Sequence, residues 1–507
     1  MLTTCPAHTV RSRRASDRLA SDDSPADHPA GPPAGPPVWR RAWHKFISDP
    51  AWFFFVVGTI FGLAMAVFIP LGNTPDENSH MARAYEVAHL RLMAEKTDGM
   101  VGVVMPASLV DPVARTDAGQ DVRAQPGLKF SFARGLSFLI STPLNKDDVV
   151  FRPTGGTATY SAVSYIPQAI AVRVGLAANL PPGSIYLLAK LFTLFVHAGL
   201  GFLTIRLWPV KPWALAAILL LPMMVAQSVS PGADAMTLSL AGLLMALVLR
   251  LRLTKDGPKL SAWALIGLGA LGTASALTKP VMALFPVLFW MIPDGRLRPG
   301  RSIVIKMSLI VTPILLSAAW LLISQATVGA QATSHGHDMG GQIDYLLAHP
   351  LAAILVFVRT WYTDFSVTTL RSMAGTFGWM DTDLPVSWVI VVFIAMTSYL
   401  VCYRRRPPML EKWPRAFLAA WALVLLYGTS MALYIGWTPP GHPLIEGVQG
   451  RYLLPMLFLL LPVSPDLARL RRRGYAMLTK TTPILLLVVS MVYIIGRYYI
   501  SPLDKIS

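Results

Sequence analysis

The sequence predicts an all-α polytopic membrane protein with about 11 transmembrane helices and a structured long first outer loop. Of the 507 residues, 54% are hydrophobic and only 14% are charged, whereas soluble domains carry about 25% charged residues. The hydrophobic residues gather in long runs, and Lys and Arg cluster in the short segments between these runs. This pattern is typical of a chain that crosses a membrane several times.

The positive charge of the chain fits the same interpretation. The net charge is +17, which in a soluble protein would suggest a nucleic-acid partner. Because the basic residues lie between apolar runs, they follow the positive-inside rule, and we expect a lipid bilayer and no nucleic acid as partner. The two cysteines, Cys5 and Cys402, provide neither a disulfide framework nor a metal-binding spacing.

The chain divides into a tail and a membrane domain. Residues 1–45 are rich in Ser, Asp, Pro, Ala and Arg and contain no apolar core, so we expect a disordered cytoplasmic tail without a cleavable signal peptide. Residues 46–507 form the polytopic membrane domain. Within it, residues 71–184 are the first extracytoplasmic loop and residues 324–385 a second extracytoplasmic segment.

The membrane helices are predicted from apolar segments that are long enough to cross alone or with flanking residues. These segments are residues 52–69, 185–207, 213–229, 233–250, 261–277, 280–292, 303–323, 386–403, 417–435, 452–463 and 483–495. The basic clusters place the amino terminus in the cytoplasm, and an odd number of crossings then places Ser507 outside. This orientation requires residues 348–365 to lie at the outer surface without crossing.

The first outer loop must contain its own structure, because structureless connections seldom exceed about 15 residues. Pro75 followed by acidic residues favours a helix that runs to about Lys96. Residues 160–180, with the sequence YSAVSYIPQAIAVRVGLAANL, favour an interfacial or partly inserted helix. Residues 111–151 are mixed and polar, and their pattern predicts no particular element.

A cluster of ionisable residues follows the first span directly, in the sequence LGNTPDENSHMARAYEVAHL. Asp76, His80 and Arg83 recur at positions i, i+4 and i+7 and therefore share one helix face. A single carboxylate would suffice to cap the helix. Two carboxylates, Asp76 and Glu77, with an imidazole one turn later favour a functional site at the membrane edge.

Four more ionisable residues fall at the same outer level of the predicted bundle. They are Lys190, Asp234, Lys279 and Arg451. Asp234 either caps the helix that follows it or serves the site, and Lys279 either reaches the surface harmlessly or binds substrate. Arg451 ends the glycine-rich sequence GVQGR, whose backbone freedom suits close approach to an anion. With Arg451 we include its neighbours Gln449 and Tyr452 as substrate-binding candidates.

With these residues in view, the chain resembles a known group of proteins. The motifs PDENSHMARAYEVA, YSAVSYIPQAI, SPGADAMTLSLAGL, ALTKP, FGWMDTDLP and GVQGRYLLP occur in this order. They resemble a bacterial family of integral membrane proteins that is classified as a domain of unknown function and is related to the GT-C glycosyltransferases. The likeness extends over about residues 52–462, and its first and last motifs are the most specific.

The resemblance implies a GT-C-like fold in the bacterial inner membrane and a catalytic acid in the first outer loop. That role falls on Asp76, or less favourably on Glu77, with His80 orienting the acid or binding a sugar hydroxyl. The implied donor is a polyprenyl-phosphate-linked sugar, and the acceptor is an envelope glycan, lipid or protein. The implied phosphate ligands are Lys279 and Arg451, assisted by Lys190 or Arg83, while Asp234 would hold the sugar or a cation.

Several alternatives stay open at this point. A divalent metal held by Asp76, Glu77 and Asp234 is compatible with the residues, but no spacing requires one, and we expect no certain cofactor. His335, His337 and Asp338 lack a fourth ligand and favour a flexible loop over a metal site. The alternative function is a transporter or flippase for an envelope lipid or polymer, and a third is a non-catalytic scaffold.

Overall fold

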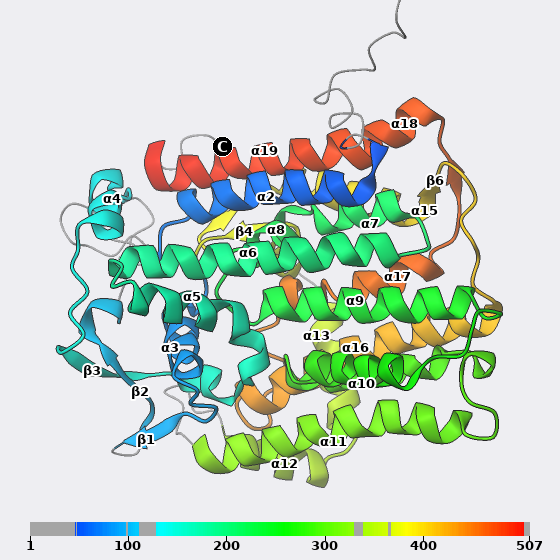
Figure 1. Ribbon diagram of the computed structural model, residues 1–507, viewed down its shortest axis with the longest axis horizontal. Coiled ribbons are helices and arrows are strands. Elements are labelled where there is room, and N and C mark those ends of the chain that lie inside the picture. The colour runs from blue at the N-terminus through cyan, green and yellow to red at the C-terminus, as the bar shows by residue number, and fades with distance from the viewer. Residues whose placement is uncertain are drawn as a thin grey trace, which may run out of the picture. The chain divides into compact units, whose positions relative to one another are not determined.

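The computed structural model describes residues 46, 48–97, 100–110, 128–328, 338–363 and 367–500. Several predictions fall outside these residues. The disordered tail, the position of Ser507 and the loop histidines His335 and His337 are among them, and they stay predictions. The fold within the described residues is mostly helical, as Figure 1 shows.

Long apolar helices form the framework of the described bundle. By length and composition, six helices among the described residues could cross a membrane, or seven if one bent pair is a single span. The six are α2 (Pro50–Phe68), α6 (Pro182–Leu207), α9 (Asp234–Leu253), α11 (Ser302–Val328), α16 (Lys412–Trp437) and the stretch Arg472–Ile500. A multi-pass membrane protein is therefore supported, and the finer count of about 11 stays a prediction.

The last of these stretches is built from four helical pieces. They are α18 (Arg472–Ala476), the π-helix η7 (Met477–Thr481), α19 (Thr482–Ile495) and the π-helix η8 (Gly496–Ile500). At the other end of the chain, α2 begins for local reasons. Pro50 occupies the first turn, and Asp49 caps the helix by accepting from the N–H groups of Ala51 (3.0 Å) and Trp52 (3.3 Å).

The other predicted spans are also helical, but they are shorter or broken. They form α7 (Pro212–Leu219), α8 (Pro222–Ser228), α10 (Ala262–Ala276), the 3₁₀-helix η4 (Pro280–Met291), α15 (Val386–Val401) and α17 (Met456–Val463). The predicted span 213–229 breaks into α7 and α8, because Leu221 is extended before Pro222 (ψ 141°). The segment α7 to α9 is nearly completely buried, and α6 packs between α2 and α9 (Figure 1).

The segment predicted as the first outer loop, residues 71–184, contains helices and, among its described residues, a small sheet that the sequence did not predict. Its helices are α3 (Glu77–Ala88), η1 (Ala107–Leu109), α4 (Phe132–Ile140), η2 (Gly155–Thr159), η3 (Ala162–Tyr165) and α5 (Ile166–Ala177). Its antiparallel strands β1 (Glu95–Thr97), β2 (Met100–Pro106) and β3 (Val149–Pro153) lie in the order β1-β2-β3. A purely α-helical description therefore fits the bundle but not this loop.

The predicted helix from Pro75 to about Lys96 is too long at its carboxyl end. α3 stops at Ala88 because Leu90 adopts a left-handed conformation (φ 59°), and the Arg91 N–H bonds back to the Glu86 carbonyl (3.0 Å). Left-handed residues commonly end helices in this way. The predicted helix over residues 160–180 corresponds to η3 and α5, which pack against α6.

The segment predicted as the second outer segment, residues 324–385, contains short helices and a hairpin among its described residues. Its elements are α12 (Met339–Ala348), α13 (Ala352–Thr363), α14 (Val367–Ala374), β4 (Thr376–Phe377) and β5 (Thr382–Asp383). α12 and α13 meet at a bend of 108°, so together they form a broken span or a re-entrant loop. The prediction that residues 348–365 do not cross stays a prediction.

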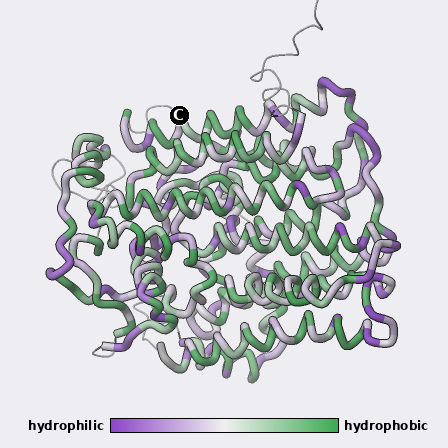
Figure 2. Tube along the Cα trace, in the orientation of Figure 1, coloured by the Kyte–Doolittle hydropathy of each residue, from purple (hydrophilic) through white to green (hydrophobic). Residues whose placement is uncertain are grey.

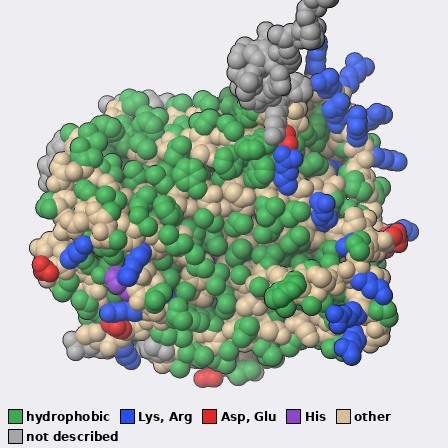
Figure 3. Space-filling model, in the orientation of Figure 1, with side chains coloured by type: hydrophobic (Ala, Val, Ile, Leu, Met, Phe, Trp, Pro, Cys, Tyr) green, Lys and Arg blue, Asp and Glu red, His purple; other side chains and the backbone are tan. Residues whose placement is uncertain are grey.

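The two ends of the described bundle differ in character. Elements of the first outer loop, α3, α4 and β1 to β3, lie at one end (left in Figure 1), and exposed Lys and Arg gather at the opposite end (Figure 3). There β6 (Cys402–Tyr403) and β7 (Ala468–Arg469) pair in parallel, which brings the exposed arginines 404–406 close to arginines 471–473. Hydrophobic residues dominate the helices between the two ends (Figure 2).

Candidate functional site

The candidate site forms where five segments that are distant in sequence meet. These are the turn before α3 with its first residues, the end of η2, the start of α9, the residues before η4, and the 3₁₀-helix η6 (Gly450–Leu453). The side chains that they contribute are Asp76, His80, Tyr160, Asp234, Lys279, Arg451 and Tyr452. Of the predicted trio, Lys279 and Arg451 share Asp234, and Asp76 lies near enough to Arg451 for that charge to act on its carboxyl.

Two cations in this cluster share one carboxylate. Lys279 forms an ion pair with Asp234, and the Arg451 Nε lies 3.8 Å from the second oxygen of the same carboxylate. The side chains of Lys279, Asp234 and Arg451 retain 14, 18 and 12% exposure, so the group is not sealed. Lys279 and Arg451 carry two positive charges against the single negative charge of Asp234, and Asp76, when ionised, balances the second.

Tyr452 borders both cations. The Lys279 Nζ lies 4.7 Å and the Arg451 guanidinium carbon 5.3 Å from the centre of the Tyr452 ring. The Arg451 Nη2 also approaches the Tyr452 hydroxyl at 3.5 Å. The Arg451 Nε is buried and finds no hydrogen-bond acceptor among the described residues. An arginine with an unused donor beside an aromatic ring retains capacity for a ligand.

Asp234 and Lys279 are positioned by their local sequences. Asp234 lies in the first turn of α9 behind Ala233, and its carboxylate pairs with Lys279, whereas the sequence left open whether it caps the helix. Lys279 has an extended backbone before Pro280. The two residues before it accept hydrogen bonds through their carbonyls from Ser161 (2.7 Å) and Ser164 (3.0 Å). The YSAVSYIP motif therefore holds the ALTKP motif in place.

Arg451 is positioned by close backbone packing against α14. The Gly450 N–H donates to the Ser372 hydroxyl at 2.8 Å. A Cβ at Gly450 would lie 2.3 Å from the Thr369 carbonyl oxygen, so only glycine fits there. Gln449 precedes η6, and its carbonyl accepts from the Tyr452 N–H (3.0 Å).

Asp76 has an unusual backbone conformation. It is left-handed (φ 56°), and its carboxylate caps no N–H of α3 among the described residues. Left-handed residues other than glycine are uncommon and are enriched at functional sites. Asp76 remains exposed, yet burial by the surrounding protein raises the pKa of its carboxyl, and the charge of Arg451 partly offsets that rise. A carboxyl with a raised pKa is a stronger base than a free aspartate.

Glu77 and Lys190 form a separate buried pair. The Glu77 Oε2 accepts from the backbone N–H (2.9 Å) and the hydroxyl (2.8 Å) of Thr74, and its other oxygen lies 3.3 Å from the Lys190 Nζ. Both side chains are completely buried. Glu77 therefore supports the turn before α3, and Lys190 neutralises it. The pair is not part of the partly exposed cluster around Asp234.

His80 lies on the inner side of the cluster. Its Nδ1 is 2.7 Å from the Tyr165 hydroxyl, and its ring stacks on Tyr160 with 6.1 Å between centroids. A Cβ at Gly232 would come within 3.3 Å of the His80 Nε2, so the ring is closely packed. Burial lowers the pKa of His80 to about 3, although the charge of Asp234 opposes this shift. His80 is therefore neutral at neutral pH.

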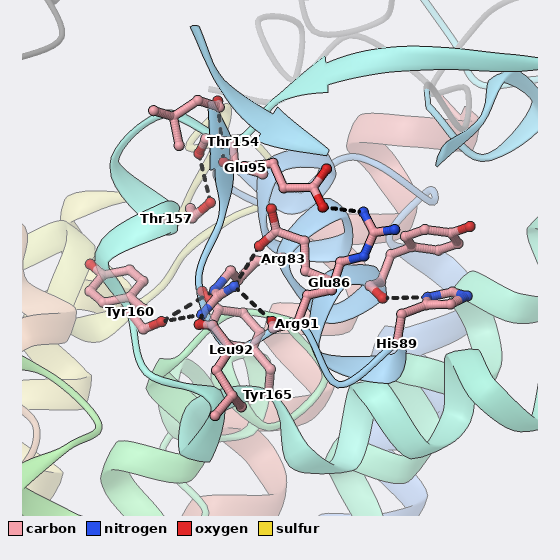
Figure 4. Close-up of polar contacts among 12 residues, drawn as sticks. Arg83, Glu86, His89, Arg91, Leu92, Glu95, Thr154, Thr157, Tyr160 and Tyr165 are labelled. Atoms are coloured by element: carbon pink, nitrogen blue, oxygen red, sulfur yellow. Dashed lines mark hydrogen bonds and ion pairs between the residues drawn. The ribbon is translucent and has the colours of Figure 1, made fainter. Parts of the chain in front are cut away.

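Arg83 is completely buried and saturated with partners, as Figure 4 shows. Its Nη1 forms an ion pair with Glu86, its Nε and Nη2 donate to the Tyr160 carbonyl at 3.2 Å each, and Nη2 also donates to the Leu92 carbonyl. These contacts tie α3 to the chain before β1 and to the end of η2. These contacts use the N–H donors of Arg83, which the sequence predicts as an assisting ligand of a lipid phosphate.

The comparisons with known proteins agree with this architecture. A family model described as "Predicted membrane protein (DUF2142)" matches residues 59–460. The chain belongs to this family. No curated protein and no solved structure matches it. The DUF2142 match covers every segment that contributes to the cluster, from Asp76 to Tyr452.

Some residues of this DUF2142 site could not be identified as site residues from the sequence. Tyr160 and Tyr165 contact His80, and Thr74 holds Glu77. The only signal in the sequence is the position of both tyrosines within the motif YSAVSYIP, whose pattern predicts an interfacial helix and no role at the site. Their contacts depend on how η2 and η3 fold against α3, and sequence spacing does not reveal this.

Two of the three carboxylates considered for a divalent metal are paired with cations of the chain itself. Asp234 is paired with Lys279 and Glu77 with Lys190. Within the described residues, no group of three His, Cys, Asp or Glu side chains could hold a metal ion. The three carboxylates considered for a divalent metal therefore do not converge in this part of the chain.

Proposed function

We propose that this chain is an integral membrane glycosyltransferase that moves a sugar from a polyprenyl-phosphate donor to an envelope glycan, lipid or protein acceptor at the extracytoplasmic face. The observation that carries the proposal is the pairing of two partly exposed cations, Lys279 and Arg451, through Asp234, near enough to the exposed Asp76 for the charge of Arg451 to act on its carboxyl. A base and an anion-binding group are the two elements that transfer from a phosphate leaving group needs.

The proposed reaction is a single substitution. The Asp76 carboxylate takes the proton of an acceptor hydroxyl, and the hydroxyl oxygen forms a bond to the anomeric carbon of the sugar. The bond between that carbon and the phosphate oxygen breaks, and its electron pair leaves with the lipid phosphate. Lys279 and Arg451 stabilise the charge that develops on this phosphate, Arg451 through its planar guanidinium and Lys279 as a point charge.

Neighbouring groups have supporting roles in this proposal. Asp234 keeps the two cations together, so that neither is an isolated charge in the cluster. Neutral His80, stacked on Tyr160, and Tyr452 offer polar and aromatic surface for the sugar. We leave Glu77, Lys190 and Arg83 out of the reacting groups, because their charges are used in buried contacts.

An apolar groove supports a lipid-linked donor. It has a volume of about 460 Å³ and runs along α15 from Val386 to Ser398, with Leu370 of α14 on its other side. These residues span about 18 Å of helix, at about 1.5 Å per residue. α14 also carries Ser372, which holds Gly450 beside Arg451. The groove along α15 is therefore a candidate position for the lipid chain of the donor.

The test combines lipid identification with one substitution. The full chain is purified in detergent, and copurifying lipid is identified by mass spectrometry; a bound polyprenyl phosphate or its sugar derivative is expected. Asp76→Asn is then compared with Asp147→Asn, an exposed acid in the same outer loop. We expect Asp76→Asn to lose transfer from a polyprenyl-phosphate sugar by at least about 100-fold and to retain lipid binding, whereas Asp147→Asn behaves like wild type.

Two outcomes would contradict the proposal. Turnover of Asp76→Asn at the wild-type rate would remove the proposed base. Movement of a lipid across reconstituted vesicles, without any glycan product, would favour the transporter or flippase that the sequence also allows. In that case the cations would bind a headgroup in transit, and no acceptor would be required.

A further inference from the structure

A second polar network lies beside the turn that presents Asp76. The Asn73 side-chain amide donates to the Tyr498 hydroxyl, which in turn donates to the Asp381 Oδ1 at 2.7 Å. The Arg497 Nη2 donates to the other oxygen of Asp381 at 2.9 Å. Asn73, Tyr498 and Arg497 are at most 3% exposed. The network joins the first outer loop, the hairpin β4–β5 and the last helical stretch of the described chain.

The backbone of the hairpin at Gly378 leaves room for the Tyr498 hydroxyl. Gly378 in the hairpin is left-handed (φ 63°), and a Cβ there would lie 1.7 Å from the Tyr498 hydroxyl. Tyr498 belongs to the π-helix η8, and π-helical segments are often found at functional sites. The Tyr498 carbonyl accepts from the Phe130 N–H at 2.8 Å. Tyr498 is therefore fixed by its backbone as well as by its hydroxyl.

The network holds the turn from which Asp76 emerges. The Asn73 N–H donates to the Pro70 carbonyl (3.1 Å), and the next residue, Thr74, is bonded to Glu77. Asp76 lies between these anchored residues in its left-handed conformation. The backbone on both sides of Asp76 is therefore held by hydrogen bonds. On the amino-terminal side, Asn73 is held by Tyr498, which is itself bonded to Asp381.

The same outer segment also holds the opposite side of the site. α14 leads directly into the hairpin, and its Ser372 accepts from the Gly450 N–H beside Arg451. The Leu384 N–H donates to the Gly375 carbonyl (3.1 Å), which closes the hairpin next to α14. α14 thus contacts the segment of Arg451 directly through Ser372, and the hairpin reaches the turn before Asp76 through Tyr498.

We propose that α14 and the hairpin β4–β5 form a positioning element that sets Asp76 relative to Arg451. Asp381 acts through Tyr498 and Asn73 on the acid, and Ser372 acts through Gly450 on the cation. Asp381, Tyr498 and Asn73 are positioning residues, since none of them belongs to the cluster of Asp234 and Lys279. The inference deepens the proposed glycosyl transfer and rests on it only for the role of Asp76 as base.

The test compares Tyr498→Phe with Tyr499→Phe in the purified full chain without substrate. Tyr498→Phe removes the acceptor of Asn73 and keeps the ring, while Tyr499 packs against Phe68 and Phe130 and serves as the matched control. Two measurements are made: hydrogen exchange of the backbone amides of residues 73, 74, 76 and 77, and the pH profile of Asp76 labelling by a water-soluble carbodiimide.

We expect Tyr498→Phe to speed exchange at these amides by about tenfold and to shift the labelling profile of Asp76, because one buried donor loses its acceptor. Tyr499→Phe should change neither. Unchanged exchange and labelling in Tyr498→Phe would overturn the proposal. Faster exchange throughout the bundle would overturn it too, because the network would then support the fold in general.

A second variant covers the case in which Tyr498→Phe does not fold. Asn73→Ala removes the same hydrogen bond from the other side and should give the same local changes; wild-type behaviour of Asn73→Ala would overturn the proposal. All these measurements are made without a sugar donor. A chain that transfers no sugar can therefore still support the positioning element, and a failed positioning test leaves the activity test of Asp76→Asn unaffected.

Discussion

The guanidinium groups of Arg83 and Arg451 differ in burial and in hydrogen-bond partners. Arg83 is completely buried, and its three nitrogens donate to Glu86 and to backbone carbonyls. Arg451 keeps 12% exposure, and its Nε has no hydrogen-bond acceptor among the described residues. Because a saturated guanidinium has no donor left for a ligand, Arg83 serves the fold and Arg451 remains available to an anion.

The first prediction separates these two roles of arginine. Arg83→Ala leaves Glu86 as an unpaired buried charge, so we expect the free energy of unfolding to fall by about 3–5 kcal/mol. Arg91→Ala is the control, because Arg91 pairs with Glu95 at the surface (46 and 51% exposed), and exposed pairs contribute about 0–1 kcal/mol. Denaturant unfolding in detergent measures both. Weaker binding of a polyprenyl phosphate to folded Arg83→Ala, with unchanged stability, would contradict this assignment.

At the scale of elements, the helices could be predicted because a membrane leaves the backbone no other partner. An apolar segment in lipid must satisfy its N–H and C=O groups internally, and helices do so. All the predicted spans are therefore helical in the structure. The break before Pro222 and the 3₁₀ conformation of η4, which contains Pro280 and Pro286, also had local signals in the prolines.

The sheet and the pairings of the site could not be predicted in this way. Register between β2 and β3 joins Gly102 to Pro153, and the ion pair of the site joins Asp234 to Lys279. Such pairs depend on tertiary packing, whereas the sequence indicates only that charged residues lie at one membrane level. That level indicates which charged residues lie near one another, but it does not reveal that Lys279 and Arg451 share Asp234. By contrast, Glu86 follows Arg83 at i+3, so this pair was visible as a local pattern.

The second prediction concerns the contact between η6 and α14. Gly450→Ala would place a Cβ 2.3 Å from the Thr369 carbonyl oxygen and 2.4 Å from the Met373 nitrogen, so η6 must shift and carry Arg451 with it. We expect about tenfold weaker binding of decaprenyl phosphate, measured by native mass spectrometry. Gly474→Ala is the control, since no described atom lies within 4 Å of its Cβ position. Equal affinity of the two variants for decaprenyl phosphate would contradict a contact between Arg451 and the phosphate.

At the scale of the whole membrane domain, the exposed arginines and the candidate site lie toward opposite ends. Arginines 404–406 and 471–473 are exposed at one end, joined by the pairing of β6 with β7. Asp76 directly precedes α3, and α3 lies with the strands β1 to β3 at the other end (Figure 1). Exposed arginines in short loops favour the cytoplasm. The site would then face the side where a lipid-linked donor meets envelope acceptors.

The third prediction tests this orientation directly. In a background without native cysteines (Cys5→Ser, Cys402→Ser), one cysteine is placed at the exposed Asp147 or at the exposed Arg405. A maleimide that cannot cross the membrane should label Asp147→Cys in intact cells and Arg405→Cys only after lysis. The reverse pattern would place Asp76 in the cytoplasm. The proposed outer-face transfer would then be untenable even if the cluster bound a lipid phosphate, because donor and acceptor would meet on the wrong side of the bilayer.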